Sequence, residues 1–285
     1  MTTPQRSVLI TGTSAGSIGS ALAIAFAKRG FLTFATARDV SKIDQHLTSL
    51  DNVHIIPLDV TSRNSIDCAY NVVAEKTGAK LDYLVNNAGT GYTTPLADFD
   101  EEKAKKVFDV NFWGVLNVTK VFMPALVSAK GTVVNISSVG AVVHTPWIGI
   151  YSASKAALTT ASETLRLELK PLGVDVVTAM VGSIETKFFT NNIPSTLPPN
   201  SLYKSIEHYI QDTDSGKNVP KGTNAAVFAE HLVKDVLQGK KGQLWRGNMA
   251  SMTKWASQCI PWGSLDGMVA SGRGVDKLKR SAPPP

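Results

Sequence analysis

SVLITGTSAGSIG, residues 7–19, joins a short apolar run to a glycine-rich turn, and small and apolar residues follow it up to Arg29. The run Ser7–Thr11 predicts a buried parallel strand, and Ser20–Arg29, which Gly30 stops, predicts a helix. Glycines let backbone amides approach a pyrophosphate, and the N-terminus of a helix adds a favourable dipole. A strand, a glycine turn and a helix in this order therefore predict a nucleotide-binding site.

The same alternation of apolar runs and helical stretches continues along the chain. Strands are predicted at 31–37, 52–58, 81–85, 132–136 and 174–180, and helices at 62–77, 103–128 and 151–169. We expect the long helix at 103–128 to bend at Pro124 or to kink where Asn111 stands near Gly114. Strands that alternate with helices predict an α/β fold, with a doubly wound parallel sheet of the Rossmann type covered by helices on both faces. A single domain over residues 1–285 is expected.

Polar and glycine residues occur at the predicted carboxyl ends of several strands, which is where ligands bind on such sheets. They are Gly12, Arg38, Asp59, Asn87 and Ser138. We therefore expect one shared cleft. Asp59 has two interpretations, because its carboxylate can accept a hydrogen bond from an adenine amino group or can simply form a turn.

Arg38 stands where a dinucleotide site usually has an acidic side chain that grips the ribose 2′-hydroxyl. A guanidinium suits a 2′-phosphate instead. The sequence therefore favours NADP(H) over NAD(H) as cofactor. Asp39 leaves an alternative open, in which Arg38 and Asp39 pair with each other on the surface.

The stretch SVGAVVHTPWIGIYSASK, residues 138–155, contains a candidate catalytic group. Tyr151 and Lys155 are four residues apart, so on a helix Lys155 can lie beneath the tyrosine ring. A phenol has a pKa of about 10, and a neighbouring ammonium favours the phenolate and lowers that pKa. Ser138 could then hold the oxygen of a carbonyl while Tyr151 delivers its proton.

The net charge and the cysteine content are compatible with a cofactor-binding α/β domain and do not point to a macromolecular partner. The net charge of +6 is compatible with a phosphate-bearing cofactor, and the scattered basic residues are weak evidence for nucleic acid binding. Cys68 and Cys259 are far apart and predict neither a disulfide framework nor a metal site. The sequence has no recognisable signal peptide or membrane span, so a cytoplasmic location is expected.

Together these motifs resemble the short-chain dehydrogenase/reductase family, a group of Rossmann-fold oxidoreductases that use NAD(P), over about residues 7–190. The resemblance implies a catalytic tetrad of Asn111, Ser138, Tyr151 and Lys155. It implies that Tyr151 is the general acid for reduction and that Ser138 orients the substrate oxygen. Lys155 would lower the tyrosine pKa and hold the nicotinamide ribose, while Asn111 would keep a water in a proton relay.

The resemblance also implies the cofactor contacts. With Arg38 they are Gly12, Ser14, Ser17, Ile18, Gly19, Asp59, Asn87, Tyr151, Lys155, Ile184 and Thr186. Two positions depart from the family pattern. The glycine turn either has one residue too many or has Ser17 in place of its middle glycine, and the serine hydroxyl could donate to phosphate. Val181 stands where a proline is usual before Gly182, which loosens the expected contacts of residues 183–186.

Longer segments of the chain carry the substrate side of the expected site. Family architecture puts a substrate lid at about 188–218 and a C-terminal extension at about 247–285. Candidate wall residues are Phe188, Phe189, Tyr203, Tyr92 and the turn from His144 to Trp147. The C-terminal tryptophans Trp245, Trp255 and Trp262 stand near basic residues. They indicate either a helix packed over the pocket or against a second subunit, which is favoured, or a peripheral membrane contact.

The expected activity is NADPH-dependent interconversion of a ketone or aldehyde and an alcohol on a fairly hydrophobic molecule, in secondary metabolism. A narrower resemblance, to the fungal 1-acyldihydroxyacetone-phosphate reductase-like branch, makes that reductase activity in glycerolipid synthesis the first alternative. A non-redox protein that uses NADP(H) structurally is the second. The family implies a homodimer or homotetramer assembled through the helices at 103–128 and 151–169.

Overall fold

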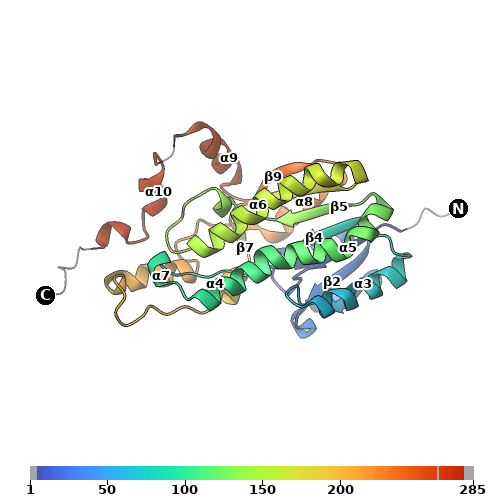
Figure 1. Cartoon of the computed structure of the whole chain (residues 1–285), viewed down its shortest axis with the longest axis horizontal. Coiled ribbons are helices and arrows are strands. Elements are labelled where there is room, and N and C mark those ends of the chain that lie inside the picture. Colours follow the sequence, from blue (N-terminus) through green and yellow to red (C-terminus); the bar gives the residue numbers. More distant parts are fainter. Residues whose placement is uncertain (1–4, 262, 279–285) are drawn as a thin grey trace.

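A computed structural model describes residues 5–261 and 263–278, and its centre is a seven-stranded parallel sheet (Figure 1). The strand order is β3-β2-β1-β4-β5-β6-β9. The strands are β1 (Ser7–Thr11), β2 (Leu32–Ala37), β3 (Val53–Pro57), β4 (Tyr83–Asn86), β5 (Thr132–Ile136), β6 (Asp175–Val181) and β9 (Gly242–Arg246). The predicted doubly wound parallel sheet is confirmed, and the chain reverses its direction of winding between β1 and β4.

Helices cover both faces of this sheet (Figure 1). One face carries α1 (Ile18–Ala27) and α8 (Ala225–Leu237), and the other carries α3 (Arg63–Thr77), α5 (Val115–Ala129) and the C-terminal end of α6 (Gly149–Leu169). The remaining helices are α2 (Gln45–Thr48), α4 (Glu101–Phe108), α7 (Glu207–Asp214), α9 (Ala250–Cys259) and α10 (Asp266–Ala270). Alternate residues of β1 serve the two layers, since Val8 and Ile10 pack under α1 and α8, whereas Leu9 packs under α3 and α5.

The long helix that the sequence predicts at 103–128 is interrupted. It begins as α4, continues through a π-helical segment, Asp109–Gly114, and resumes as α5. The irregularity therefore lies where Asn111 and Gly114 stand, while Pro124 lies inside α5. By length and composition Glu101–Ala129 could cross a membrane, and it is the one stretch of the described residues for which this holds. Val118, Phe122 and Leu126 are fully buried against the sheet, as in the core helix of a globular domain.

Three strands were missed by sequence reasoning. β9 extends the sheet beyond β6, and the short strands β7 (Ile184–Glu185) and β8 (Thr223–Asn224) pair with each other. Only Trp245 of β9 is buried, so this edge strand has no continuous apolar run to reveal it. The β7–β8 pair fixes the segment after Val181, for which the missing proline had left the expected contacts loose.

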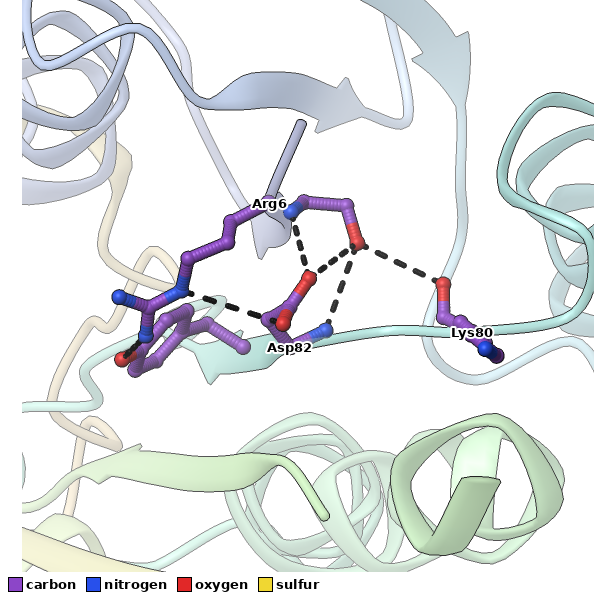
Figure 2. A network of polar contacts seen from close by, with 5 residues as sticks. Arg6, Lys80 and Asp82 are labelled. Carbon is purple, nitrogen blue, oxygen red and sulfur yellow. Dashed lines mark hydrogen bonds and ion pairs between the residues drawn. The ribbon is translucent and has the colours of Figure 1, made fainter. Parts of the chain in front are cut away.

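A polar network joins the amino-terminal ends of β1 and β4, at the end of the sheet opposite the expected cleft (Figure 2). The Asp82 carboxylate accepts a hydrogen bond from the Ser7 amide at 2.8 Å and lies 3.9 Å from the Arg6 guanidinium. Arg6 also donates to the Tyr83 hydroxyl and lies over the Phe31 ring. These contacts anchor the central strands at one end and leave their carboxyl ends to the site.

Gly182 tests the packing that positions the strands next to the site. A Cβ at this residue would lie 2.0 Å from the Asn248 carbonyl oxygen and 3.1 Å from the Ala250 amide, both of which are backbone atoms. We expect Gly182→Ala to lower the free energy of unfolding by about 1–3 kcal/mol, because the backbone must move to accept the methyl group. Gly267→Ala is the control, since a Cβ there meets nothing within 4 Å. Urea denaturation measures both, and equal stability of the two variants would contradict the prediction.

Candidate active site

A cavity of about 1460 Å³ opens at the carboxyl ends of the strands and brings together most of the residues singled out from the sequence. Its wall includes Gly12, Ser14, Ser17, Ile18, Arg38, Asp59, Asn87, Ser138, Tyr151, Lys155, Ile184 and Thr186. Gly19 and Asn111 lie behind this wall rather than in it. The expected shared cleft therefore exists, and two of the selected residues, Gly19 and Asn111, are buried next to it without lining it.

The glycine turn is held against the tip of β4 by contacts that leave no room for side chains. Gly12 has a φ of +74°, and a Cβ there would lie 2.9 Å from the Cα of Ala88. A Cβ at Gly19 would lie 2.3 Å from the Gly12 carbonyl oxygen. Asn87 donates from Nδ2 to the carbonyl oxygens of Thr11, at 2.9 Å, and Gly12, at 2.8 Å. Its side chain thus binds the turn itself, while the residue also lines the cavity.

Ser17 explains how the altered turn still starts a helix. Its backbone is extended, with φ of −99°, so the position does not require a glycine. Its hydroxyl oxygen accepts a hydrogen bond from the Ser20 amide at 3.1 Å and donates to the Gly12 carbonyl at 3.3 Å. Ser17 is therefore the N-cap of α1, which begins two residues earlier than predicted. Its hydroxyl is occupied by the protein rather than directed to a phosphate.

Two cations line the cavity beyond the end of β2. Arg38 is exposed and makes no ion pair or hydrogen bond with any residue that the structure describes. Asp39 does not pair with it, because its carboxylate binds Ser41 and lies 3.9 Å from Lys42 Nζ. Lys42, which sequence reasoning missed, lines the same part of the chain's cavity. The Asp59 carboxylate accepts from the amide and hydroxyl of Thr61, so its turn-forming role is present and one face of the residue lines the cavity.

Tyr151, Ser138 and Lys155 meet at the cavity wall. The Tyr151 ring and the Ser138 hydroxyl both lie next to Gly140, and the Ser138 oxygen accepts a hydrogen bond from the Gly140 amide at 3.0 Å. Lys155 Nζ lies 5.9 Å from the centre of the Tyr151 ring and donates to the Ile136 carbonyl at 2.8 Å. The one-turn spacing on α6 thus stacks the ammonium under the ring, as the sequence predicts.

Burial sets the protonation of this pair. It raises the pKa of Tyr151, and the polar Ser138 side chain beside it offsets part of that rise. It also lowers the pKa of Lys155 to about 8, because the residue is only 5% exposed and its ammonium has a carbonyl rather than a carboxylate as its partner. Loss of solvation thus raises the pKa of Tyr151 in this structure, and its lowering by Lys155 stays a prediction.

Asn111 lies in the π segment and is fully buried. Its Oδ1 accepts from the Thr90 amide at 2.9 Å, and its Nδ2 donates to the Thr90 carbonyl and to the Ser154 hydroxyl. Ser154 in turn donates to the Tyr151 carbonyl at 2.7 Å. The side chain of Asn111 therefore fastens α6 to the loop after β4, and its role in holding a water stays a prediction.

The substrate side of the cavity contains some, not all, of the aromatic residues expected there. Tyr92, His144, Phe188 and Phe189 line it, and the Phe188 ring lies 5.7 Å from the Tyr151 ring. Trp147 and Tyr203 do not line it; they pack on each other with ring centres 5.5 Å apart. Sequence reasoning also missed two cations that line the cavity. Lys187 packs against Gly16 of the glycine turn, and Arg273 comes from the C-terminal segment.

The C-terminal tryptophans have different environments. Trp245 is buried against Met180 and Ala250, whereas Trp255 on α9 is 61% exposed. Trp262 lies outside the described residues. α9 lines the cavity through residues that include Met252, Thr253 and Ala256, so this helix packs over the pocket, which is the interpretation favoured from the sequence.

Comparison with known proteins gives the family. A family model described as short chain dehydrogenase matches residues 6–196, well over half of the chain. The chain belongs to the short-chain dehydrogenase family. Short-chain dehydrogenase ptmH of Penicillium ochrochloron is 48% identical over 257 residues, which cover 90% of this chain and 94% of that protein. An NADPH-dependent 1-acyldihydroxyacetone phosphate reductase of Schizosaccharomyces pombe is 36% identical over 93% of this chain and 90% of its own.

Solved structures agree with this membership. A short chain dehydrogenase from Burkholderia cenocepacia in complex with NADP has a TM-score of 0.71 and 25% identity, over 90% of this chain and 94% of that one. The chain is thus an oxidoreductase of a family that uses a nicotinamide cofactor. The cavity suits such a cofactor. It runs from the glycine turn, past the cations Arg38 and Lys42, to Tyr151, whose hydroxyl can exchange a proton.

Lys155 gives this dehydrogenase a testable pH dependence. Below about pH 8 the folded chain holds a buried ammonium, and above it the folded form loses the proton, while the unfolded chain keeps it up to the ordinary value of 10.5. The unfolded state binds more protons between these values, so the free energy of unfolding should rise with pH there. Relative to Lys155→Met, the wild type should gain on the order of 2 kcal/mol between about pH 7 and about pH 9.5. Chemical denaturation at the two pH values measures this gain, and a parallel pH dependence of the two proteins would refute the assignment.

Proposed function

We propose that this enzyme uses NADPH to reduce a ketone or aldehyde on a fairly hydrophobic molecule, or runs the reverse reaction. The observation that carries the proposal is the position of Tyr151 beside Ser138 at the wall of the cavity that Arg38 also lines. A group that can give a proton and a site for a phosphorylated dinucleotide thus share one space, which is what carbonyl reduction requires. The intact tetrad disfavours a purely structural use of the cofactor.

The residues have distinct roles in this proposal. The bound nicotinamide supplies the hydride. Ser138 donates a hydrogen bond to the substrate oxygen and so orients the carbonyl, and Tyr151 gives its proton to that oxygen as negative charge develops there. The raised pKa of Tyr151 keeps the hydroxyl protonated and ready to act as an acid. Lys155, with its pKa near 8, can pass a proton at neutral pH, and Asn111 keeps α6 in position through Ser154.

Charge supports NADP(H) over NAD(H). Arg38 has no protein partner in the described chain, and Asp39 turns to Ser41 instead of opposing a phosphate. A second cation, Lys42, lines the same region. The named cofactor of the Burkholderia neighbour is NADP, and the Schizosaccharomyces relative is named as NADPH-dependent. A 2′-phosphate on the adenosine ribose would satisfy both cations.

The wall supports a hydrophobic substrate. The Phe188 ring packs on both Tyr151 and Phe189, and Met249, Met252 and Met268 line the part of the cavity under the C-terminal helices. Such a wall suits an aliphatic tail or a polycyclic compound of secondary metabolism. The relative named as a 1-acyldihydroxyacetone phosphate reductase makes an acylated phosphate ketone the second candidate, because its chain could occupy this apolar part.

We further infer a homodimer or homotetramer through the helices at 101–129 and 149–169. Trp113 in the π segment is 54% exposed, and Leu167 on α6 is 62% exposed. Large apolar side chains that water reaches on two neighbouring helices are typical of a subunit interface.

Arg38→Ala tests the cofactor. The variant should weaken NADPH binding about 10–100-fold and leave NADH binding nearly unchanged, because only NADPH carries the phosphate. Titration of nucleotide fluorescence with purified protein measures both dissociation constants. Arg63→Ala is the control, since Arg63 pairs with Asp67 on α3 and does not line the cavity. An equal loss for the two nucleotides would remove the proposed phosphate contact.

Tyr151→Phe tests the chemistry. We expect kcat for ketone reduction to fall about 10²–10⁴-fold while NADPH binding changes little, because the change removes a proton donor and leaves the ring in place. Tyr203→Phe, outside the cavity, should keep the wild-type kcat. Absorbance at 340 nm across a panel of hydrophobic ketones follows turnover. Full activity of Tyr151→Phe would exclude the proposed acid.

A further inference from the structure

Arg273 is fixed at a junction of three segments on the substrate side of the cavity. Its Nε donates to the Val269 carbonyl of α10 at 3.0 Å, and its Nη1 donates to Asn218 Oδ1, at the end of the lid segment, at 3.3 Å. Its own carbonyl accepts from Trp147 Nε1 at 2.9 Å, four residues before Tyr151. The guanidinium therefore has a defined orientation, and it lines the cavity.

The charge of Arg273 has no acidic partner. No carboxylate among residues 5–261 and 263–278 lies within ion-pair distance of it, although Asp266 lines the same cavity. Asp212 and Asp276, which belong to nearby segments, pair with Lys217 and Lys277 instead. The side chain is partly buried, and burial lowers the pKa of Arg273. A guanidinium withdrawn from water without a counter-charge is costly unless a ligand supplies one.

The remaining donors of Arg273 are suited to an oxyanion. A guanidinium has five N–H groups, and the two bonds to Val269 and Asn218 leave three of them without a protein acceptor. Apolar residues of the neighbouring segments, Leu265, Met268 and Val219, line the same cavity, and the Arg273 side chain is partly withdrawn from water. Attraction between opposite charges is strong in such surroundings because little water screens it.

We propose that the substrate carries an oxyanion, either a carboxylate or a phosphate, which binds Arg273. The substrate carbonyl then lies at Tyr151, and an apolar portion packs against the cavity wall between α9 and α10. This inference rests on the proposed carbonyl reduction and names its substrate class. Arg273 would act as a specificity residue, since it touches the substrate away from the reacting atoms. Neutral ketones would still reach Tyr151, with less binding energy.

Direct binding tests the anion site independently of turnover. The purified full chain with NADPH is titrated with dodecanoate, dodecyl phosphate and dodecanol, and tryptophan fluorescence reports binding because the Trp147 indole contacts the Arg273 backbone. We expect at least one anion to bind more tightly than the alcohol. Arg273→Gln should weaken that anion about 10–100-fold and leave dodecanol unchanged, while Arg273→Lys should retain part of the affinity. Lys277→Gln, an exposed cation on the same segment, is the control and should match the wild type.

Turnover then distinguishes the two oxyanions. The matched pairs are 4-benzoylbutyrate with its methyl ester, and 1-palmitoyl-dihydroxyacetone phosphate with 1-palmitoyl-dihydroxyacetone. The charged member of one pair should have the higher kcat/KM, and Arg273→Gln should raise its KM while the kcat/KM of the neutral member stays unchanged.

Two results overturn the inference. One is equal binding of the two anions and dodecanol by the wild type; the other is an equal loss of anion and alcohol binding in Arg273→Gln, which would make Arg273 a purely structural link. If neutral ketones are reduced and no anion is preferred, the carbonyl reduction stands and the anion site fails. If anions bind through Arg273 and no ketone is reduced, the proposed reduction fails instead.

Discussion

The close approach of the glycine turn to the tip of β4 is the constraint on which the site depends. Gly12 packs on the backbone of Ala88, and the Asn87 amide binds the carbonyls of Thr11 and Gly12, so two neighbouring strands end against each other without intervening side chains. Because of this contact α1 can begin just beyond the carboxyl end of β1, with its N-terminal amides toward the cavity. The parallel register of the strands then fixes where the other functional segments lie relative to these carboxyl ends.

Lys155 illustrates how the site trades stability for chemistry. The fold encloses an ammonium and gives it only the Ile136 carbonyl, although a shorter or apolar side chain would be easier to bury at this position of α6. The same enclosure that weakens the folded state brings the proton affinity of the amine near the physiological range. Amide donors deeper in the core, by contrast, are paired with protein acceptors: Asn86 Nδ2 donates to Thr119 and Asn135, and Asn135 Nδ2 donates to Ser162.

What could be predicted from the sequence depended on how local the signal was. The strand, turn and helix at the N-terminus are contiguous, and Tyr151 and Lys155 are one helical turn apart, so spacing alone revealed them. β9 gave no signal, because an edge strand with one buried residue has no apolar run. Arg273 could not be assigned to the cavity from its neighbours, since its contacts come from residues 147, 218 and 269. The raised pKa of Tyr151 could not be predicted either, because burial is a property of the completed fold.

The π segment at 109–114 sets the rotational phase of everything that follows it in the same rod. One extra residue per turn rotates the downstream side chains by roughly 100° about the axis relative to an uninterrupted α-helix. That offset brings Asn111 inward and still directs Val118 and Phe122 to the sheet. Removing a single residue from this wide turn would restore a regular α-helix and leave the apolar stripe of α5 facing the sheet. The extra residue therefore serves the placement of Asn111 rather than the packing of the core.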